Sequence, residues 1–458
     1  MSFSTPLFLF IFFPIMYIGY LFLPKNLRNA WLLLSSLVFY TWSGFKFLIV
    51  LLLFTIINYS FGLLIENDRK KAILIFAVVC DLSFLLWYKY ANFILMNIAS
   101  LLPVKISVVT KSTEFTQNFI MPMGLSFFTF RGVSYIADIY KDKVKACKNF
   151  GGFLLYMVMF PYIISGPIVR YTEISGTVVA NKTIDTEEIY TGLKRFVYGL
   201  SKKVLIADVL GEAVTRVFVS SGSIVSWLGM IIYSLQLYFD FSGYSDMAIG
   251  IGNMLGYHFC ENFDNPYKAR SIKEFWRRWH ISLSNWFRDY LYIPLGGNRK
   301  GTLATYRNLM VVFLATGLWH GASWNFVVWG LWHGVFMLLE RVGLDKILKR
   351  LPVFIQRIYT LLIVGIGWLM FRSVNIIDNL KIIANLFTFK ESETYNWIGY
   401  MDLRYTVCIL LATAWCAIGA DRILKNKLWS DIVVFAMLIL SVISISASNF
   451  SPFLYLRF

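Results

Sequence analysis

VVFLATGLWHGASWNFVVWGLWHGVFMLL, residues 311–339, contains no Asp, Glu, Lys or Arg but holds two histidines, His320 and His333. Such an apolar stretch is typical of a membrane segment, because about 20 residues of helix cross the hydrocarbon core of a bilayer. Imidazole is costly to bury in lipid, so an ionisable residue inside such a segment is a candidate functional residue. The stretch therefore predicts a membrane-embedded site around His320.

The rest of the chain has the same character. Of its 458 residues, 58% are hydrophobic and 15% are charged, whereas a soluble domain carries about a quarter charged residues. We predict an all-α polytopic membrane protein, one domain over 1–458, with about ten to twelve crossings, some of them re-entrant or half-spanning. The predicted spans are Pro6–Leu23, Ala30–Trp42, Phe47–Ile65, Ala72–Trp87, Phe150–Ile164, Ile224–Leu237, Ile249–Phe259, Asn308–Leu318, Phe326–Leu339, Ile358–Phe371, Tyr405–Ile418 and Val433–Ile445.

The formal net charge is +17. In a soluble protein this excess would point to nucleic acid, but here the basic residues lie in loops between apolar runs. Such placement favours membrane topology and contact with anionic membrane lipids, and we predict no nucleic-acid binding. The positive-inside rule places the loop with Lys25 and Arg28 in the cytoplasm. The five cysteines form no CxxC pair, so no metal site is predicted.

A basic, tryptophan-rich block precedes the histidine-containing stretch. We predict one helix over Ser271–Tyr292, on which Trp276, His280 and Ser284 share a face at a spacing of four residues. Glu274 and Arg278 are also four apart and can form an ion pair. A basic helix with tryptophans is typical of the membrane interface.

Histidine suits proton transfer near neutral pH. We interpret His320 as a general base, with a hydrogen-bonded core histidine as the alternative. Gly317 and Gly321 permit close approach of backbone or substrate, and Trp319 and Trp324 supply an apolar wall. His280 would orient a substrate carbonyl or share in proton handling, or else be one more residue of an interfacial helix. His333 is predicted to serve helix packing.

Asp240 and Asp246 lie in another apolar run. We favour a structural ion pair with an arginine of the 270–299 block for Asp240, which would hold the shape of the reaction chamber; a polar cavity is the alternative. The chain lacks GxSxG, P-loop, HExxH, GxGxxG and His-x4-Asp motifs. Their absence disfavours a covalent serine enzyme, an ATPase and a zinc protease.

A series of landmarks spreads over most of the chain: Pro122–Phe130, Ser165–Ile168, Gln236–Ala248, Asn265–Tyr267, Glu274–Ser284, Tyr292–Asn298, Gly317–Gly334 and Ser451–Phe458. With them the chain resembles the membrane-bound O-acyltransferase (MBOAT) family. It is most similar to the bacterial branch that contains the alginate O-acetyltransferase membrane protein and the teichoic-acid D-alanyl-transfer membrane protein. The resemblance implies a ring of tilted helices with re-entrant or interfacial helices around a central tunnel, in a bacterial plasma membrane.

The resemblance also implies the site. His320 would be the catalytic histidine and His280 the second family position. The residues expected to contact substrate are Trp276, Arg277, Trp319, Trp324, Asn325 and Asp240. The expected reaction takes an acyl group, most naturally acetyl, from a cytoplasmic thioester donor (acetyl-CoA or a phosphopantetheine carrier), with no permanently bound cofactor. The basic block from Lys268 to Arg299 would attract such a donor, although membrane topology explains it equally well. Expected partners are this carrier and an extracytoplasmic SGNH-type acetyltransferase that O-acetylates an exopolysaccharide or wall polymer.

Two other functions stay open at this point. D-alanyl transfer to teichoic acid belongs to the same branch. A non-enzymatic transporter or flippase would also place charged residues inside spans along a path through the membrane.

Overall fold

The computed structural model describes residues 1–101, 121–179, 185–219, 221–372, 375–388, 401–418 and 427–447, and the Ser451–Phe458 landmark lies outside them. Within these ranges the chain is helical, and its only strand-like pairing is an isolated antiparallel bridge between Phe263 and Trp279. The all-α prediction is thus confirmed. The chain groups into two compact units, and its organisation as one domain stays a prediction.

The first unit is formed by Met1, Leu7–Ile189 and Ile251–Cys260. Its most enclosed helix, α7, is buried over nearly its whole length, from Leu125 to Ile139. No span was predicted over these residues. The helices and helical turns of this unit are η1 (Phe8–Phe12), α1 (Phe13–Phe22), α2 (Lys25–Thr41), α3 (Phe45–Asn67), α4 (Lys71–Leu85), η2 (Leu86–Tyr90), α5 (Ala91–Leu101), α7 (Leu125–Tyr140), α8 (Phe150–Val158) and α9 (Tyr171–Val179).

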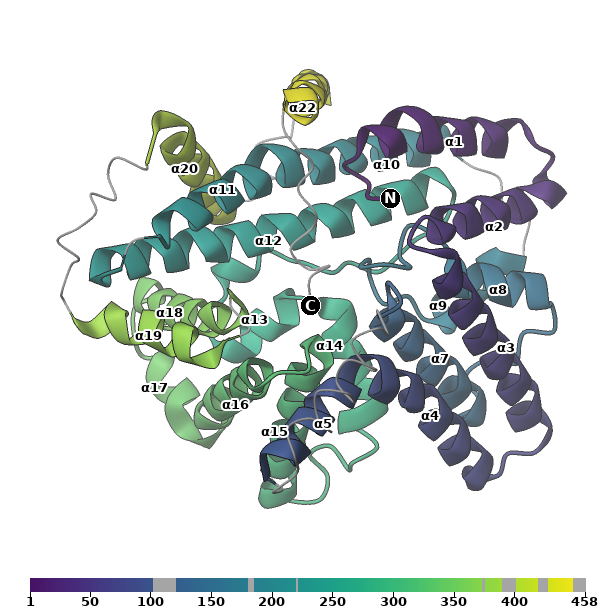
Figure 1. Cartoon of the computed structure of the whole chain (residues 1–458), viewed down its shortest axis with the longest axis horizontal. Coiled ribbons are helices and arrows are strands. Elements are labelled where there is room, and N and C mark those ends of the chain that lie inside the picture. The colour runs from purple at the N-terminus through teal and green to yellow at the C-terminus, as the bar shows by residue number, and fades with distance from the viewer. Residues whose placement is uncertain are drawn as a thin grey trace. The chain divides into compact units, whose positions relative to one another are not determined.

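The second unit is formed by Ser2–Pro6, Tyr190–Gly250 and Glu261–Phe458 and contains His280, His320 and His333. Its long helix α12 is drawn in teal in Figure 1, and the last residues of this helix, from Ile251 on, belong to the first unit. The elements of this part of the chain are α10 (Thr186–Ser201), η3 (Lys202–Ala207), α11 (Asp208–Val217), α12 (Ser223–Met254), η4 (Pro266–Lys268), α13 (Ile272–Arg278), α14 (Ile281–Phe287), η5 (Arg288–Tyr292), α15 (Thr302–His320), α16 (Trp324–Leu339), η6 (Glu340–Leu344), α17 (Asp345–Leu348), α18 (Val353–Arg372), α19 (Ile376–Thr388), α20 (Leu403–Ile418) and α22 (Lys427–Ala447).

Six described helices are long and apolar enough to cross a membrane, and two shorter apolar helices, Phe8–Phe22 and Leu403–Ile418, accompany them. The count of ten to twelve crossings stays a prediction. The six helices are Phe45–Asn67, Lys71–Leu101, Ser223–Met254, Trp324–Leu348, Val353–Arg372 and Leu428–Ala447.

Two predicted boundaries were wrong. Ile224–Leu237 and most of Ile249–Phe259 belong to the single 32-residue helix α12, which continues through the polar residues between the two apolar runs, where Asp240 and Asp246 pair with cations of α10 and η3. The predicted span Phe150–Ile164 contains only the nine-residue helix α8, and the chain leaves the helix after Val158.

Helices α10 and α12 approach each other closely at two pairs of glycines. A Cβ atom at Gly199 would lie 2.5 Å from the carbonyl oxygen of Gly243, and one at Gly250 would lie 2.6 Å from that of Gly192. Small residues allow two helix backbones to come this near, a common arrangement in membrane proteins. The contact brings the basic residues of α10 and η3 next to the carboxylates of α12.

Helices α15 and α16, which carry His320 and His333, form a similarly tight pair. A Cβ atom at Gly317 of α15 would lie 2.2 Å from the carbonyl oxygen of Phe326, and one at Gly330 of α16 would lie 2.5 Å from that of Phe313. The close backbone approach expected at Gly317 is confirmed. The glycines therefore fix how His320 is presented beside α16.

We expect Gly317→Ala to destabilise this helix pair, since its methyl group would meet backbone that cannot rotate away. Overpacking of a close contact costs about 1–3 kcal/mol. The measurement is the apparent midpoint of thermal unfolding of the purified protein in detergent. Gly176→Ala is the matched control, because a Cβ atom there meets nothing within 4 Å. Equal midpoints for the two variants would contradict the prediction.

Candidate active site

His320 is the last residue of α15 and only 6% exposed. Aromatic rings from three helices surround its imidazole: the ring centroids of Trp319, Trp329 and Phe371 lie 5.0, 5.1 and 5.1 Å away. These rings keep water away from the imidazole on several sides. The C-terminal end of α15 carries a partial negative charge, which stabilises an imidazolium formed there. The position therefore suits a residue that takes up a proton during a reaction.

His280 does not lie on a continuous helix, so the prediction of one helix over Ser271–Tyr292 was wrong. The chain breaks between α13 and α14, and His280 has left-handed backbone angles, with φ 44° and ψ 56°. Residues other than glycine adopt this conformation only at a cost of about 1–3 kcal/mol.

The preceding loop produces the break. The backbone N–H of Asp264 donates to the carbonyl of Arg278 (2.9 Å), and that of Ile281 donates to the carbonyl of Asn262 (3.0 Å). These bonds engage groups that an uninterrupted helix would have used itself. The predicted ion pair between Glu274 and Arg278 does form, at 3.0 Å, within α13.

The side chain of His280 is 1% exposed and hydrogen-bonded through Nδ1 to Oδ1 of Asn262, at 3.0 Å. Burial lowers the pKa of His280 to about 3, so the imidazole is neutral at physiological pH. Its ring centroid lies 4.8 Å from that of Phe241 and 6.0 Å from that of Trp319.

Trp319 thus contacts the rings of both His280 and His320. The structure therefore places His280 and His320, the two histidines predicted as site residues, against the same indole ring. The expected role of Trp319 as an apolar wall of a substrate site stays a prediction.

A second aromatic cluster adjoins the first. Trp276 lies 5.0 Å from the ring of His333 and 5.4 Å from that of Trp329, which also contacts His320. His333 is fully buried among these rings, as expected of a packing residue. Of the other predicted substrate contacts, Asn325 is buried, whereas Arg277 and Trp324 have exposed side chains and are not enclosed with the histidines.

The partner predicted for Asp240 was wrong. Its carboxylate pairs with Lys203 of η3 at 2.8 Å, and Lys203 also pairs with Asp208 at 2.7 Å. The reason is the close packing of α10 and η3 against α12, which places Lys203 beside Asp240. Asp240 and Lys203 are both nearly fully buried. The expected contact of Asp240 with substrate stays a prediction.

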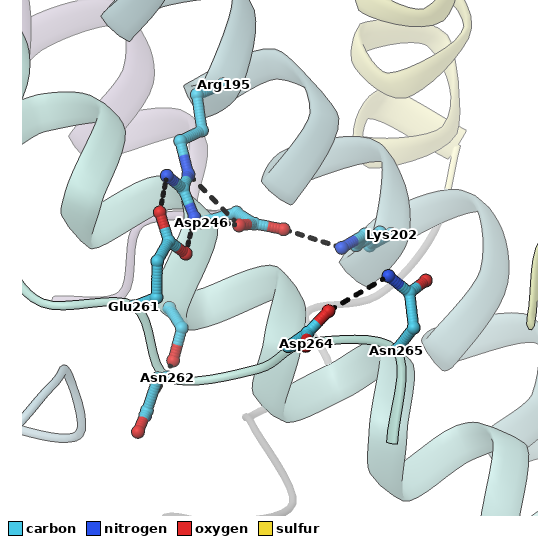
Figure 2. A network of polar contacts seen from close by, with 8 residues as sticks. Arg195, Lys202, Asp246, Glu261, Asn262, Asp264 and Asn265 are labelled. Carbon is cyan, nitrogen blue, oxygen red and sulfur yellow. Dashed lines mark hydrogen bonds and ion pairs between the residues drawn. The ribbon is translucent and has the colours of Figure 1, made fainter. Parts of the chain in front are cut away.

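A charged pocket of about 710 Å³ lies beside the same helices, and Asn262 and Ser245 are among its lining residues. Figure 2 shows Arg195 between Glu261, which it meets through two 2.5 Å bonds, and Asp246, at 3.0 Å. Burial lowers the pKa of Arg195, but the bonds to Glu261 and the charge of Asp246 outweigh this effect and raise it above its usual value.

On the other side of the same carboxylate, Lys202 donates to Asp246 at 2.6 Å. The positive charges of Arg195 and Lys202 in this part of the pocket are thus neutralised by the carboxylates of Glu261 and Asp246. The pocket also reaches Asn262, the residue after Glu261 in the chain (Figure 2). The side chain of Asn262 is hydrogen-bonded to His280.

Three residues of the site were not predicted from the sequence: Asn262, Trp329 and Phe371. Trp329 had one sequence signal, since it lies four residues before His333 on the same helix face. Phe371 comes from α18 and Asn262 from a loop, and nothing in the sequence pairs either of them with a histidine.

Comparison with known proteins shows the family of the chain. The chain matches the membrane-bound O-acyltransferase family over residues 33–380, a range that contains both His280 and His320. It is 36% identical to the "Probable alginate O-acetylase AlgI" of Pseudomonas putida, with all of both chains covered.

Two further relatives match different shares of this chain. The chain is 33% identical to the "Peptidoglycan O-acetyltransferase" of Helicobacter pylori, over 100% of this chain and 97% of that protein. It is 30% identical to the "Teichoic acid D-alanyltransferase" of Streptococcus thermophilus, but over only 57% of this chain and 65% of that protein. With its apolar helices, its histidine cluster and its full-length relatives, the chain belongs to the MBOAT family and is a membrane-embedded O-acyltransferase.

Proposed function

We propose that the protein transfers an acetyl group from a cytoplasmic thioester to a hydroxyl group destined for an exopolysaccharide or cell-wall polymer. The observation that carries this proposal is the placement of two buried histidines against one indole ring, Trp319. The names of the two full-length relatives support acetyl as the group. The D-alanyltransferase relative is matched over a smaller share of the chain, so D-alanyl transfer is the second candidate.

In the proposed reaction, His320 takes the proton of the acceptor hydroxyl as the hydroxyl oxygen attacks the thioester carbonyl carbon. The new carbon–oxygen bond forms the ester, the carbon–sulfur bond breaks, and the departing thiolate takes back the proton from His320. General-base assistance of this kind contributes about 10²–10⁴ in rate. The aromatic rings around His320 support the proposal because a neutral thioester enters an apolar site at little cost in solvation.

His280 would orient the reacting groups. Its Nδ1 is engaged by Asn262, so its interaction with substrate would involve Nε2. Trp319 and Trp276 would supply the apolar surroundings of the reacting carbonyl. A donor of hydrogen bonds to the developing oxyanion would contribute about 10²–10³ more.

The donor is proposed to be acetyl-CoA or an acetylated phosphopantetheine carrier. Exposed cations around α13 and η5 support an anionic donor, because five of them form no ion pair with a described carboxylate: Arg270, Lys273, Arg277, Arg299 and Lys300. Arginine and lysine bind phosphate groups well. The positive-inside rule explains the same cations by topology, so only a binding measurement separates the two explanations.

The acceptor side is proposed to be extracytoplasmic, with the protein in the bacterial plasma membrane. An SGNH-type acetyltransferase outside the membrane would then pass the acetyl group to the polymer. This arrangement would divide the reaction between a membrane-embedded transfer and a final transfer in the aqueous phase.

The test is mass spectrometry of the surface polymers of cells with and without the gene, repeated after the gene is restored. We expect O-acetyl esters to disappear with the gene and to return with it. Loss of D-alanyl esters instead would establish the second candidate function. Unchanged esters of both kinds would overturn the proposal.

A further inference from the structure

Asn262, in the loop before η4, is fully buried and its side-chain amide is held from both ends. The oxygen Oδ1 accepts from the hydroxyl of Ser282 at 2.9 Å and from its backbone N–H at 3.3 Å. The nitrogen Nδ2 donates to the hydroxyl of Ser245 at 3.1 Å. A backbone N–H can only donate, so the contact with Ser282 fixes the oxygen end of the amide toward α14.

This orientation decides which nitrogen of His280 carries the proton. Oδ1 of Asn262 lies 3.0 Å from Nδ1 of His280, and an amide oxygen only accepts hydrogen bonds. Nδ1 must therefore donate. A neutral imidazole has one N–H, so the lone pair resides on Nε2.

Ser282 does not offer an equally good alternative partner to Nδ1. Its hydroxyl lies 3.5 Å from Nδ1 of His280 but 2.9 Å from Oδ1 of Asn262, and its single proton is used in the shorter bond. The network therefore favours one arrangement of protons, with Asn262 as the common acceptor.

The same residue also fixes the backbone of His280. The carbonyl of Asn262 accepts from the N–H of Ile281, the residue that follows the left-handed turn at His280. Backbone and side chain of Asn262 thus hold the imidazole on two sides. A residue in this unfavourable backbone conformation persists only where its surroundings impose the conformation.

We propose that Asn262 is a positioning residue that holds His280 in the Nδ1–H tautomer, so that Nε2 is the nitrogen available to accept a hydrogen bond during acyl transfer. The link to catalysis rests on the role proposed for His280. The tautomer itself does not, and it can be measured without any assay of activity.

The experiment is ¹⁵N solid-state NMR of the full-length protein in lipid bilayers, with ¹⁵N-labelled histidine. The chain has four histidines, and the signals of His280 are those lost in His280→Gln. For the unsubstituted protein we expect one neutral species at His280, protonated on Nδ1. Protonation on Nε2 would overturn the proposal before any variant of Asn262 is made.

In Asn262→Ala we expect the signals of His280 to change to a mixture of tautomers or to the Nε2–H form. The matched control is Asn265→Gly, three residues along the same loop, where the amide bonds only to Asp264 among the described contacts, at 3.4 Å, and where glycine suits the left-handed backbone. If Asn262→Ala does not fold, Asn262→Asp serves instead: it keeps an acceptor oxygen and removes the donor to Ser245, so the Nδ1–H form should remain. A tautomer unaffected by Asn262→Ala, or lost in Asn262→Asp, would overturn the proposal.

Activity measurements separate this proposal from the proposed function. We expect Asn262→Ala to lower kcat about 10–100-fold with little change in KM, as is typical when the partner that orients a functional histidine is removed. If the tautomer changes while activity stays at the level of Asn265→Gly, the positioning of His280 by Asn262 stands and the proposed role of His280 in transfer fails.

Discussion

His320→Ala is expected to lower the rate of O-acylation by about 10²–10⁴, the usual contribution of a general base. The imidazole lies at the end of α15 among Trp319, Trp329 and Phe371, and no other described histidine occupies that place. The measurement is ester formation on the surface polymer in cells that produce equal amounts of the variant and the unsubstituted protein in their membranes.

The control for this experiment is His258→Gln. His258 has an exposed side chain in the first unit, where it lies 3.2 Å from Glu188, and it has no proposed part in transfer. Its replacement should leave ester formation unchanged. Ester formation by His320→Ala at the level of His258→Gln would remove His320 from the mechanism.

The second large effect is expected from Lys203→Met. This change removes the cation that neutralises Asp240, whose side chain is only 3% exposed, and also the partner of Asp208. Breaking a buried ion pair by removal of one partner costs about 3–5 kcal/mol, because the remaining charge is left in a medium of low dielectric constant. We expect a much lower apparent unfolding temperature in detergent and a low yield of membrane-inserted protein.

Two further variants test this explanation. The double variant Lys203→Met with Asp240→Asn should recover most of the lost stability, since no uncompensated charge then remains at Asp240. Arg404→Met breaks an exposed pair with Glu212 and should cost less than about 1 kcal/mol. A double variant no more stable than Lys203→Met alone would show that packing of the lysine chain, and not the charge of Asp240, causes the loss.

The sequence was sufficient to predict the elements whose cause is local. Apolar runs such as Phe47–Ile65 and Ile358–Phe371 lie within observed helices because a segment of this length and composition has no other stable state in lipid. His320 could be predicted as a site residue for the same reason, since its cost in an apolar segment is visible in the sequence itself.

The features that could not be predicted depend on partners distant in sequence. The break at His280 exists because the backbone of Asn262 and Asp264 pairs with the chain around it, and helical periodicity carries no information on such a loop. An arginine of the 270–299 block was predicted as the partner of Asp240, whereas the structure shows Lys203. Both the 270–299 block and α10–η3 contain cations that could pair with this carboxylate. Only the packing of the helices decides between them.

The contact between α10–η3 and α12 has a consequence for how the protein can change shape. Its pairs form an antiparallel ladder, in which residue numbers rise along α10–η3 and fall along α12: Gly192 meets Gly250, Gly199 meets Gly243, and Lys203 meets Asp240. A slide by one helical turn, about 5.4 Å, would strip the lysine of its counterion and drive side chains into backbone at the same moment. The contact therefore opposes sliding of α10–η3 along α12.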